Sequence, residues 1–134
     1  MTKILVVDDK PVFRSRLEAA VSGDDREVTI AGSLEEALRL IEENDFAIVV
    51  TDLGLKGGPG EEGLEVIKAA KAKDVYTQVI AVSTYTNPEV NAKAMDLGAY
   101  TYLQRKMPAP EFQHEVASNV QAALDLRRKM LGEL

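Results

Sequence analysis

Short apolar runs alternate with amphipathic segments along the whole chain. The runs at 4–7 and 46–51 are rich in β-branched residues, which is typical of strands buried on both faces of a parallel sheet. Between such runs, apolar residues recur at helical spacing, most clearly over 34–43. The pattern predicts strands at about 3–7, 27–31, 46–51, 78–83 and 100–103, and helices at about 11–22, 34–43, 62–72, 88–97 and 109–131.

Local signals mark the ends of several predicted helices. Ser33 followed by Glu36 forms a capping box at the start of one helix. Asn87 before Pro88 indicates the start of another, and Gly98 indicates where that helix ends. Five strand–helix units in a row predict an α/β fold, a doubly wound parallel sheet with helices on both faces.

Composition and charge narrow the class of protein. The chain has 134 residues, which fits a single domain over 1–134, and its net charge is −6. Because the first basic cluster is 127–129, near the end, we expect no nucleic-acid binding. There is no cysteine, and His114 alone cannot build a histidine metal site. No apolar stretch approaches the roughly 20 residues that span a membrane, and no signal peptide is evident, so a cytoplasmic location is expected.

Three aspartates follow two of the predicted strands directly. Asp8 and Asp9 come after the first strand, and Asp52 comes after the third. Ligands of open α/β sheets bind beyond the carboxyl ends of the strands, so these carboxylates should converge there. Three like charges repel unless a cation sits among them or a proton is shared. Hard oxygen ligands with room for water favour Mg²⁺, so the sequence predicts a Mg²⁺ pocket able to take up a phosphoryl group.

Two further strand ends complete the arrangement. The strand at 78–83 ends in Ser83 and Thr84, and the strand at 100–103 ends near Arg105 and Lys106. With the acid pair, the lone acid, the hydroxyl and the cation in this order, the chain resembles the receiver domain of two-component response regulators. The resemblance covers about residues 3–125, which leaves 126–134 as a linker helix or tail.

The resemblance implies a five-stranded parallel sheet of order 2-1-3-4-5 with five helices, the flavodoxin-like fold. It implies a Mg²⁺ site made of Asp8, Asp9, Asp52 and the backbone carbonyl of Gly54. Asp52 would be the phosphoacceptor, Ser83 the switch hydroxyl and Tyr102 the switch aromatic. The partner implied is a histidine kinase or a histidine phosphotransfer protein. The domain would be a phosphorylation-controlled switch of a two-component system and not an enzyme acting on small molecules.

The chain departs from the family pattern in two places. Arg105 stands where the family has a lysine, and Lys106 stands where it has a proline. Either Arg105 contacts the phosphoryl group through its fork, or a one-residue bulge brings Lys106 in. The glycine-rich loop from Gly54 to Gly63 is also longer than the family's. The substitution at Arg105 motivates an alternative function, a pseudo-receiver that serves as an interaction module without phosphorylation.

Simpler roles are open to three of the candidate residues. Asp9 could cap the helix that starts at Pro11, Ser83 could be a plain strand-end hydroxyl, and Tyr102 could simply pack. A flavin carrier is a different function for the same fold, but it would need a phosphate-binding loop after the first strand, where the acid pair would repel phosphate.

The last predicted helix is longer than a receiver needs. From Glu111 to Leu131 it would span about 30 Å at about 1.5 Å per residue. We expect one apolar stripe of this helix to dock against the sheet, namely Phe112, Val116, Val120, Ala123 and Leu124. Its apolar residues also hint at a heptad-like seam, which would serve a homodimer or lead to a downstream output domain. The seam consists of Ala117, Val120, Leu124 and Leu131.

Overall fold

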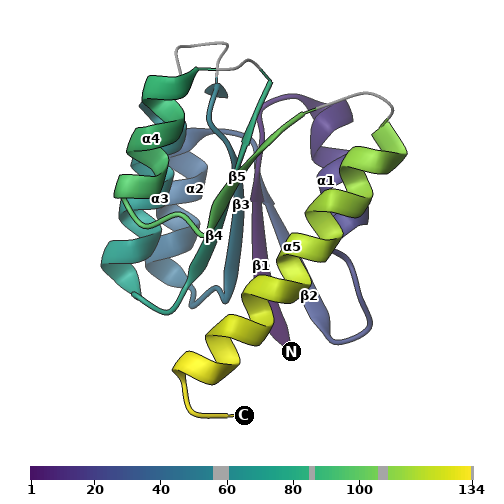
Figure 1. The fold of residues 1–134 in the computed structure, drawn as a ribbon, viewed down its shortest axis with the longest axis vertical. Helices are drawn as coiled ribbons and strands as arrows, with labels where there is room; N and C mark the ends of the chain where they lie inside the picture. Colours follow the sequence, from purple (N-terminus) through teal and green to yellow (C-terminus); the bar gives the residue numbers. More distant parts are fainter. Residues whose placement is uncertain (56–60, 85–86, 106–108, 134) are drawn as a thin grey trace.

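The computed structural model describes residues 1–55, 61–84, 87–105 and 109–133. The strands are β1 (Thr2–Val7), β2 (Arg26–Ala31), β3 (Ile48–Asp52), β4 (Gln78–Ser83) and β5 (Thr101–Gln104). The helices are α1 (Pro11–Val21), α2 (Leu34–Glu43), α3 (Glu61–Lys73), α4 (Pro88–Asp96) and α5 (Ala109–Met130). All strand pairs are parallel, and the sheet order is β2-β1-β3-β4-β5 (Figure 1). The predicted flavodoxin-like fold is therefore confirmed.

The sheet separates two hydrophobic layers. Ile4 and Val6 of β1 pack with α1 and α5, whereas Leu5 and Val7 pack with α2, α3 and α4 (Figure 1). Successive side chains of a strand point to opposite faces, so one apolar run supplies both layers. This alternation decides to which face of the sheet the side chain at each strand end points.

The predicted elements agree with the structure to within two residues, and the local signals account for their ends. The Ser33 hydroxyl accepts a hydrogen bond from the Glu36 N–H at 3.2 Å, as a capping box requires. Asn87 caps α4 in the same way, and Gly98 follows that helix with a φ of 103°. The predicted third strand begins two residues too early, because the residues before Ile48 are buried but lie outside the ladder.

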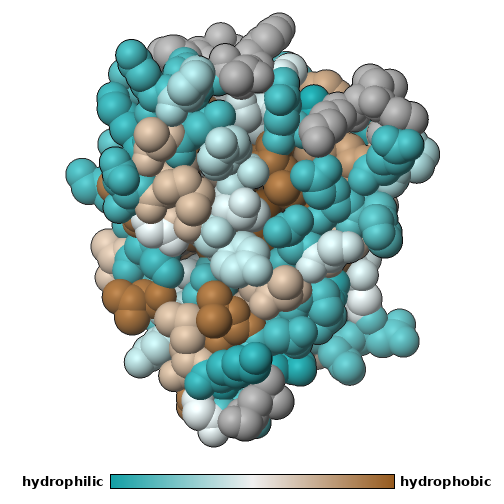
Figure 2. Space-filling model, viewed as in Figure 1, coloured by the Kyte–Doolittle hydropathy of each residue, from teal (hydrophilic) through white to brown (hydrophobic). Residues whose placement is uncertain are grey.

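The C-terminal helix docks along its length against the sheet (Figure 1). Val120 and Leu124 are buried in the layer that α5 shares with α1. The predicted docking stripe is therefore confirmed, and the heptad-like seam is wrong for these two positions, because they already pack against the sheet. The large exposed apolar side chains of the helix are Leu126 and Met130. Apolar side chains gather at the lower left of the face drawn in Figure 2. Within the described residues, no helix is long and apolar enough to cross a membrane.

The start of α3 packs against the backbone that follows β3. A Cβ added to Gly63 would lie against the Leu53 Cα and 2.6 Å from the Asp52 carbonyl oxygen. Since both neighbours are backbone atoms at the end of a fully buried strand, they cannot rotate away. The absence of a side chain at Gly63 thus lets the helix approach the segment that carries Asp52. Residues 56–60 of the predicted glycine-rich loop lie outside the described part of the chain.

We expect Gly63→Ala to lower the free energy of unfolding by about 1–3 kcal/mol, as overpacking in a filled site does. Gly23→Ala is the matched control, because its Cβ would meet only the flexible Arg26 side chain, at 3.1 Å. Urea unfolding of both variants measures the difference. Equal stabilities of the two variants would contradict the close approach.

Candidate functional site

The register of the central strands brings the three aspartates together. Val7 of β1 pairs with Thr51 of β3, so the residues that follow, Asp8 and Asp52, lie side by side at the edge of the sheet. Asp52 itself pairs with Val82 of β4. Parallel strands end at a common edge, and this edge lies where ligands of open α/β sheets bind.

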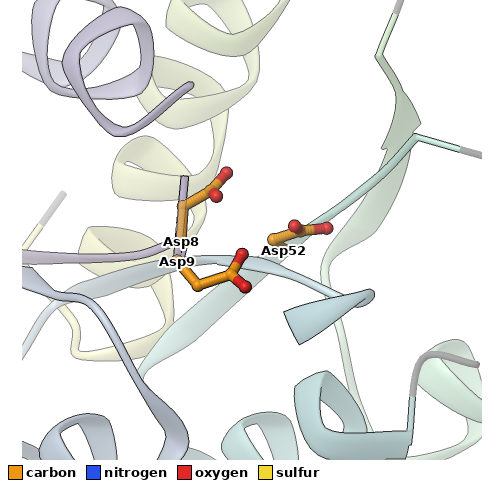
Figure 3. Close-up of side chains that lie close together, drawn as sticks. All are labelled: Asp8, Asp9 and Asp52. Carbon is orange, nitrogen blue, oxygen red and sulfur yellow. The ribbon is translucent and has the colours of Figure 1, made fainter. Parts of the chain in front are cut away.

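The carboxylates form a compact acidic cluster, defined here as Asp8, Asp9 and Asp52. One carboxylate oxygen from each lies within 4.8 Å of the others. Asp8 is 0% and Asp52 1% exposed, while Asp9 is partly buried. Figure 3 shows the Asp9 carboxylate reaching toward Asp52, while the Asp8 carboxylate leaves the strand end in a different direction. The predicted convergence of the three acids is present.

Neighbouring donors hold the cluster. The Lys10 N–H donates to Asp8 Oδ1 at 2.9 Å, and the Gly54 N–H donates to Asp52 Oδ1 at 3.0 Å. The Lys10 ammonium lies 3.5 Å from Asp9 Oδ1. Lys10 is also the N-terminal capping residue of α1, so the alternative in which Asp9 caps this helix is wrong.

Burial dominates the electrostatics of the two innermost acids. It raises the pKa of Asp8, which the Lys10 N–H lowers in part and the Asp52 carboxylate raises further. It also raises the pKa of Asp52, against the Gly54 N–H and the Arg105 guanidinium. A carboxyl whose pKa is raised by folding destabilises the fold as pH rises through that folded-state value. The cluster is thus a site where negative charge is held at a cost.

Arg105 is the cation of the site, and its partner is Asp8. Its Nη2 lies 2.9 Å from Asp8 Oδ2, and its side chain is 8% exposed. The Arg105 N–H donates to the Ser83 carbonyl at 2.7 Å, which continues the β4–β5 pairing beyond Gln104. Burial lowers the pKa of Arg105, yet a guanidinium stays protonated in proteins. Lys106, the other predicted candidate, lies outside the described residues.

The remaining predicted residues lie around this edge. Ser83 ends β4 and is 8% exposed. Tyr102 pairs with Ala81 in the sheet and is 43% exposed. Sequence reasoning missed two rings, Phe13 and Phe112, whose centroids lie 4.0 and 5.4 Å from Arg105 Cζ. Their place beside a strand-end cation depends on how α1 and α5 pack, which no local pattern reports.

Comparison with known proteins assigns this arrangement to a family. A family model described as the response regulator receiver domain matches residues 4–117. The chain belongs to the response regulator receiver domain family. A receiver domain is a signalling module of two-component systems, so the predicted family is confirmed.

Individual relatives agree with this assignment. The chain is 31% identical over 137 residues to the transcriptional regulatory protein YdfI of Bacillus subtilis (strain 168), covering 100% of this chain and 62% of that protein. The crystal structure of a CheY-like receiver domain protein from Methanospirillum hungatei JF-1 matches with a TM-score of 0.81 at 24% identity, covering 97% of this chain and 98% of that one. A Burkholderia pseudomallei response regulator, solved with a phosphorylated aspartic acid, calcium ion and citrate, matches with a TM-score of 0.71 at 25% identity, covering 94% and 74%. The receiver thus spans less than two thirds of YdfI.

We expect Asp52→Asn to stabilise the metal-free receiver at neutral pH. The amide keeps the shape of the side chain but removes one of three clustered charges. The gain should be roughly 1 kcal/mol, an ordinary size for a single substitution. It should vanish at low pH, where Asp52 is protonated in both the folded and the unfolded wild type. Thermal unfolding in a chelating buffer from pH 3 to pH 8 measures this, with the exposed Asp24→Asn as control. A gain that does not depend on pH would contradict the electrostatic account.

Proposed function

We propose that this receiver accepts a phosphoryl group on Asp52 from the phosphohistidine of a histidine kinase or histidine phosphotransfer protein, in the presence of Mg²⁺. The observation that carries the proposal is the acidic cluster, three carboxylates that meet within 4.8 Å at the carboxyl edge of the sheet. The Burkholderia pseudomallei relative, solved with a phosphorylated aspartic acid and a calcium ion, supports the same use of such a site.

The residues of the cluster fit a hard divalent cation. They supply only oxygen donors, and the raised pKa values of Asp8 and Asp52 mean that a cation would relieve an existing cost. We assign the metal to Asp8, Asp9, Asp52 and the backbone carbonyl of Gly54. Bound there, Mg²⁺ would neutralise charge on the phosphoryl oxygens during transfer.

Asp52 supplies the nucleophile in this mechanism. The Gly54 N–H holds its Oδ1, so we assign the attack on phosphorus to Oδ2. The new Oδ2–P bond forms in line with the P–N bond to the donor histidine, which breaks. Because Asp52 is 1% exposed, the donor must bring the phosphoryl group to Asp52 at the carboxyl edge of the sheet.

Ser83 and Arg105 have different roles in the proposal. The hydroxyl of Ser83, at the end of the neighbouring strand β4, would donate a hydrogen bond to a phosphoryl oxygen. Arg105 would offset charge from the Asp8 side, where its ion pair lies. Tyr102 lies on β5, which pairs with β4. Its side chain would carry the change at Ser83 to the exposed surface around α4 and β5. The output would be read there by a homodimer partner or by a downstream domain.

One observation favours a second function, the pseudo-receiver. The family's lysine slot holds Arg105, and the ion pair of this residue is with Asp8 and not with the proposed phosphoacceptor. Such a domain would keep the fold and bind partners without phosphorylation. Retention of all three acids opposes this second function, since an unused acidic cluster is a standing cost to stability.

We expect a small-molecule phosphodonor to add the mass of one phosphoryl group when Mg²⁺ is present. The adduct should be absent with a chelator, and absent in Asp52→Asn, which lacks the nucleophile. Intact-mass spectrometry after acid quenching measures it, with Asp45→Asn as a control for loss of an exposed acid. No adduct in the wild type would sink the phosphoacceptor and favour the pseudo-receiver.

We expect Ser83→Ala to keep Mg²⁺-dependent phosphorylation but to lose the change at Tyr102. The hydroxyl is proposed to act after transfer, so its removal should leave the mass adduct intact. Amide chemical shifts of β5 and α4, recorded before and after phosphorylation, measure the response. Ser83→Thr is the matched control, because it retains the hydroxyl and should retain the shifts. Full shifts in Ser83→Ala would contradict the role.

A further inference from the structure

The Arg105 guanidinium is held in a way that its hydrogen bonds do not explain. Its Nη2 contacts Asp8, but Nε and Nη1 are buried and have no hydrogen-bond partner in the described structure. Each buried donor without a partner destabilises the folded state. A cluster with three carboxylates lies beside it, so a freely rotating guanidinium would turn to satisfy more donors. Something other than hydrogen bonding keeps it in place.

Two aromatic faces supply that hold. The Phe13 ring centroid lies 4.0 Å from Arg105 Cζ, a stacking distance, and the Phe112 ring lies 5.4 Å away. Phe112 is 2% exposed and Phe13 is partly buried, so the cation meets these faces largely out of water. Cation–π contacts stabilise more strongly when the cation is desolvated, as the Arg105 guanidinium largely is.

The alternation of the strands explains why these groups meet. Arg105 follows Leu103 by two residues and Asp8 follows Val6 by two, and both Leu103 and Val6 face the α1–α5 layer. Arg105 therefore enters on the face where Phe13 of α1 and Phe112 of α5 lie. Lys10 differs, because its ammonium approaches Asp9 from solvent with a side chain that is 46% exposed.

We propose that Phe13 and Phe112 are positioning residues that hold the Arg105 guanidinium on Asp8, which is the positioning role. We propose further that this fixed cation competes with Mg²⁺ and so sets the metal affinity of the acidic cluster, which is the counter-ion role of Arg105. The counter-ion role rests on the proposed function, which assigns Mg²⁺ to the cluster. A cation that stands 2.9 Å from one ligand residue opposes the entry of another cation. An arginine suits this role and a lysine does not, because the planar guanidinium stacks on rings and an ammonium keeps its hydration shell.

The positioning role of the aromatic rings is tested without metal by a double-mutant cycle. Phe13→Leu keeps an apolar side chain of similar size but removes the ring face, and Arg105→Met removes the cation. We expect Phe13→Leu to lower the thermal midpoint in the wild-type background by at least twice as much as in the Arg105→Met background. Phe13→Tyr, which keeps the face, should match the wild type. Equal losses in both backgrounds would overturn the positioning role.

The counter-ion role of Arg105 is tested by calorimetric titration with MgCl₂ at constant ionic strength, which needs no phosphodonor. We expect Phe13→Leu to bind Mg²⁺ about three- to tenfold more tightly than the wild type, a range set by a cation–π contact. Arg105→Met should bind at least as tightly as Phe13→Leu, and Phe13→Tyr should match the wild type. Asp52→Asn identifies the part of the heat that belongs to the cluster.

The outcomes separate the two proposals. Coupling in the cycle with unchanged Mg²⁺ affinity in Phe13→Leu and Arg105→Met would overturn the counter-ion role and leave the aromatic hold. A wild type and an Arg105→Met variant that both fail to bind Mg²⁺ would overturn the proposed metal site and the counter-ion role with it. Tighter binding in both variants, without any phosphoryl adduct, would support the inference while the phosphoacceptor function fails.

Discussion

The parallel pairing of β1 with β3 is the constraint on which the rest of the receiver depends. Both strands are buried on both faces, and their register is set by apolar side chains that enter two separate layers. Residues 4–7 are all 0% exposed, and burying each such side chain contributes about 1.5–3 kcal/mol. Two carboxylates about 4 Å apart repel by about 4 kcal/mol near a protein surface. The apolar ladder therefore prevails, and Asp8 and Asp52 are carried together by strands that cannot slip.

The protein offsets this repulsion with groups from several different segments. Backbone N–H groups of Lys10 and Gly54 each hold one carboxylate oxygen, the Lys10 ammonium lies beside Asp9, and Arg105 pairs with Asp8. The pKa values of Asp8 and Asp52 nevertheless remain raised, chiefly because both carboxyls are buried. A site that holds buried charge at a cost responds to any change in its charge, which is what a switch requires.

The parts of this structure that depend on local patterns could be predicted from the sequence. Apolar runs identified the strands, and acids directly after two runs located the cluster, because chain connectivity alone brings strand ends to one edge. For the last helix the sequence allowed two predictions, a stripe docked on the sheet and a heptad-like seam, and the seam failed at the two positions that they share. An apolar stripe at Val120 and Leu124 has the same spacing whether it faces a partner helix or its own sheet, and only packing decides. The ion-pair partner of Arg105 could not be predicted from a local pattern either, since Asp8 lies 97 positions away in the sequence.

Arg105 also links parts of the receiver that the sequence keeps far apart. Its backbone continues the β4–β5 pairing, its Nη2 contacts Asp8 after β1, and its guanidinium lies over rings from α1 and α5. Ser83, at the end of β4, is the hydroxyl proposed to respond to a phosphoryl group on Asp52. The charge of Asp52 also acts on Arg105, whose guanidinium lies on the α1–α5 side of the sheet. The stacked guanidinium thus connects the acidic cluster to the α1–α5 layer, through planar ring contacts that suit an arginine better than a lysine.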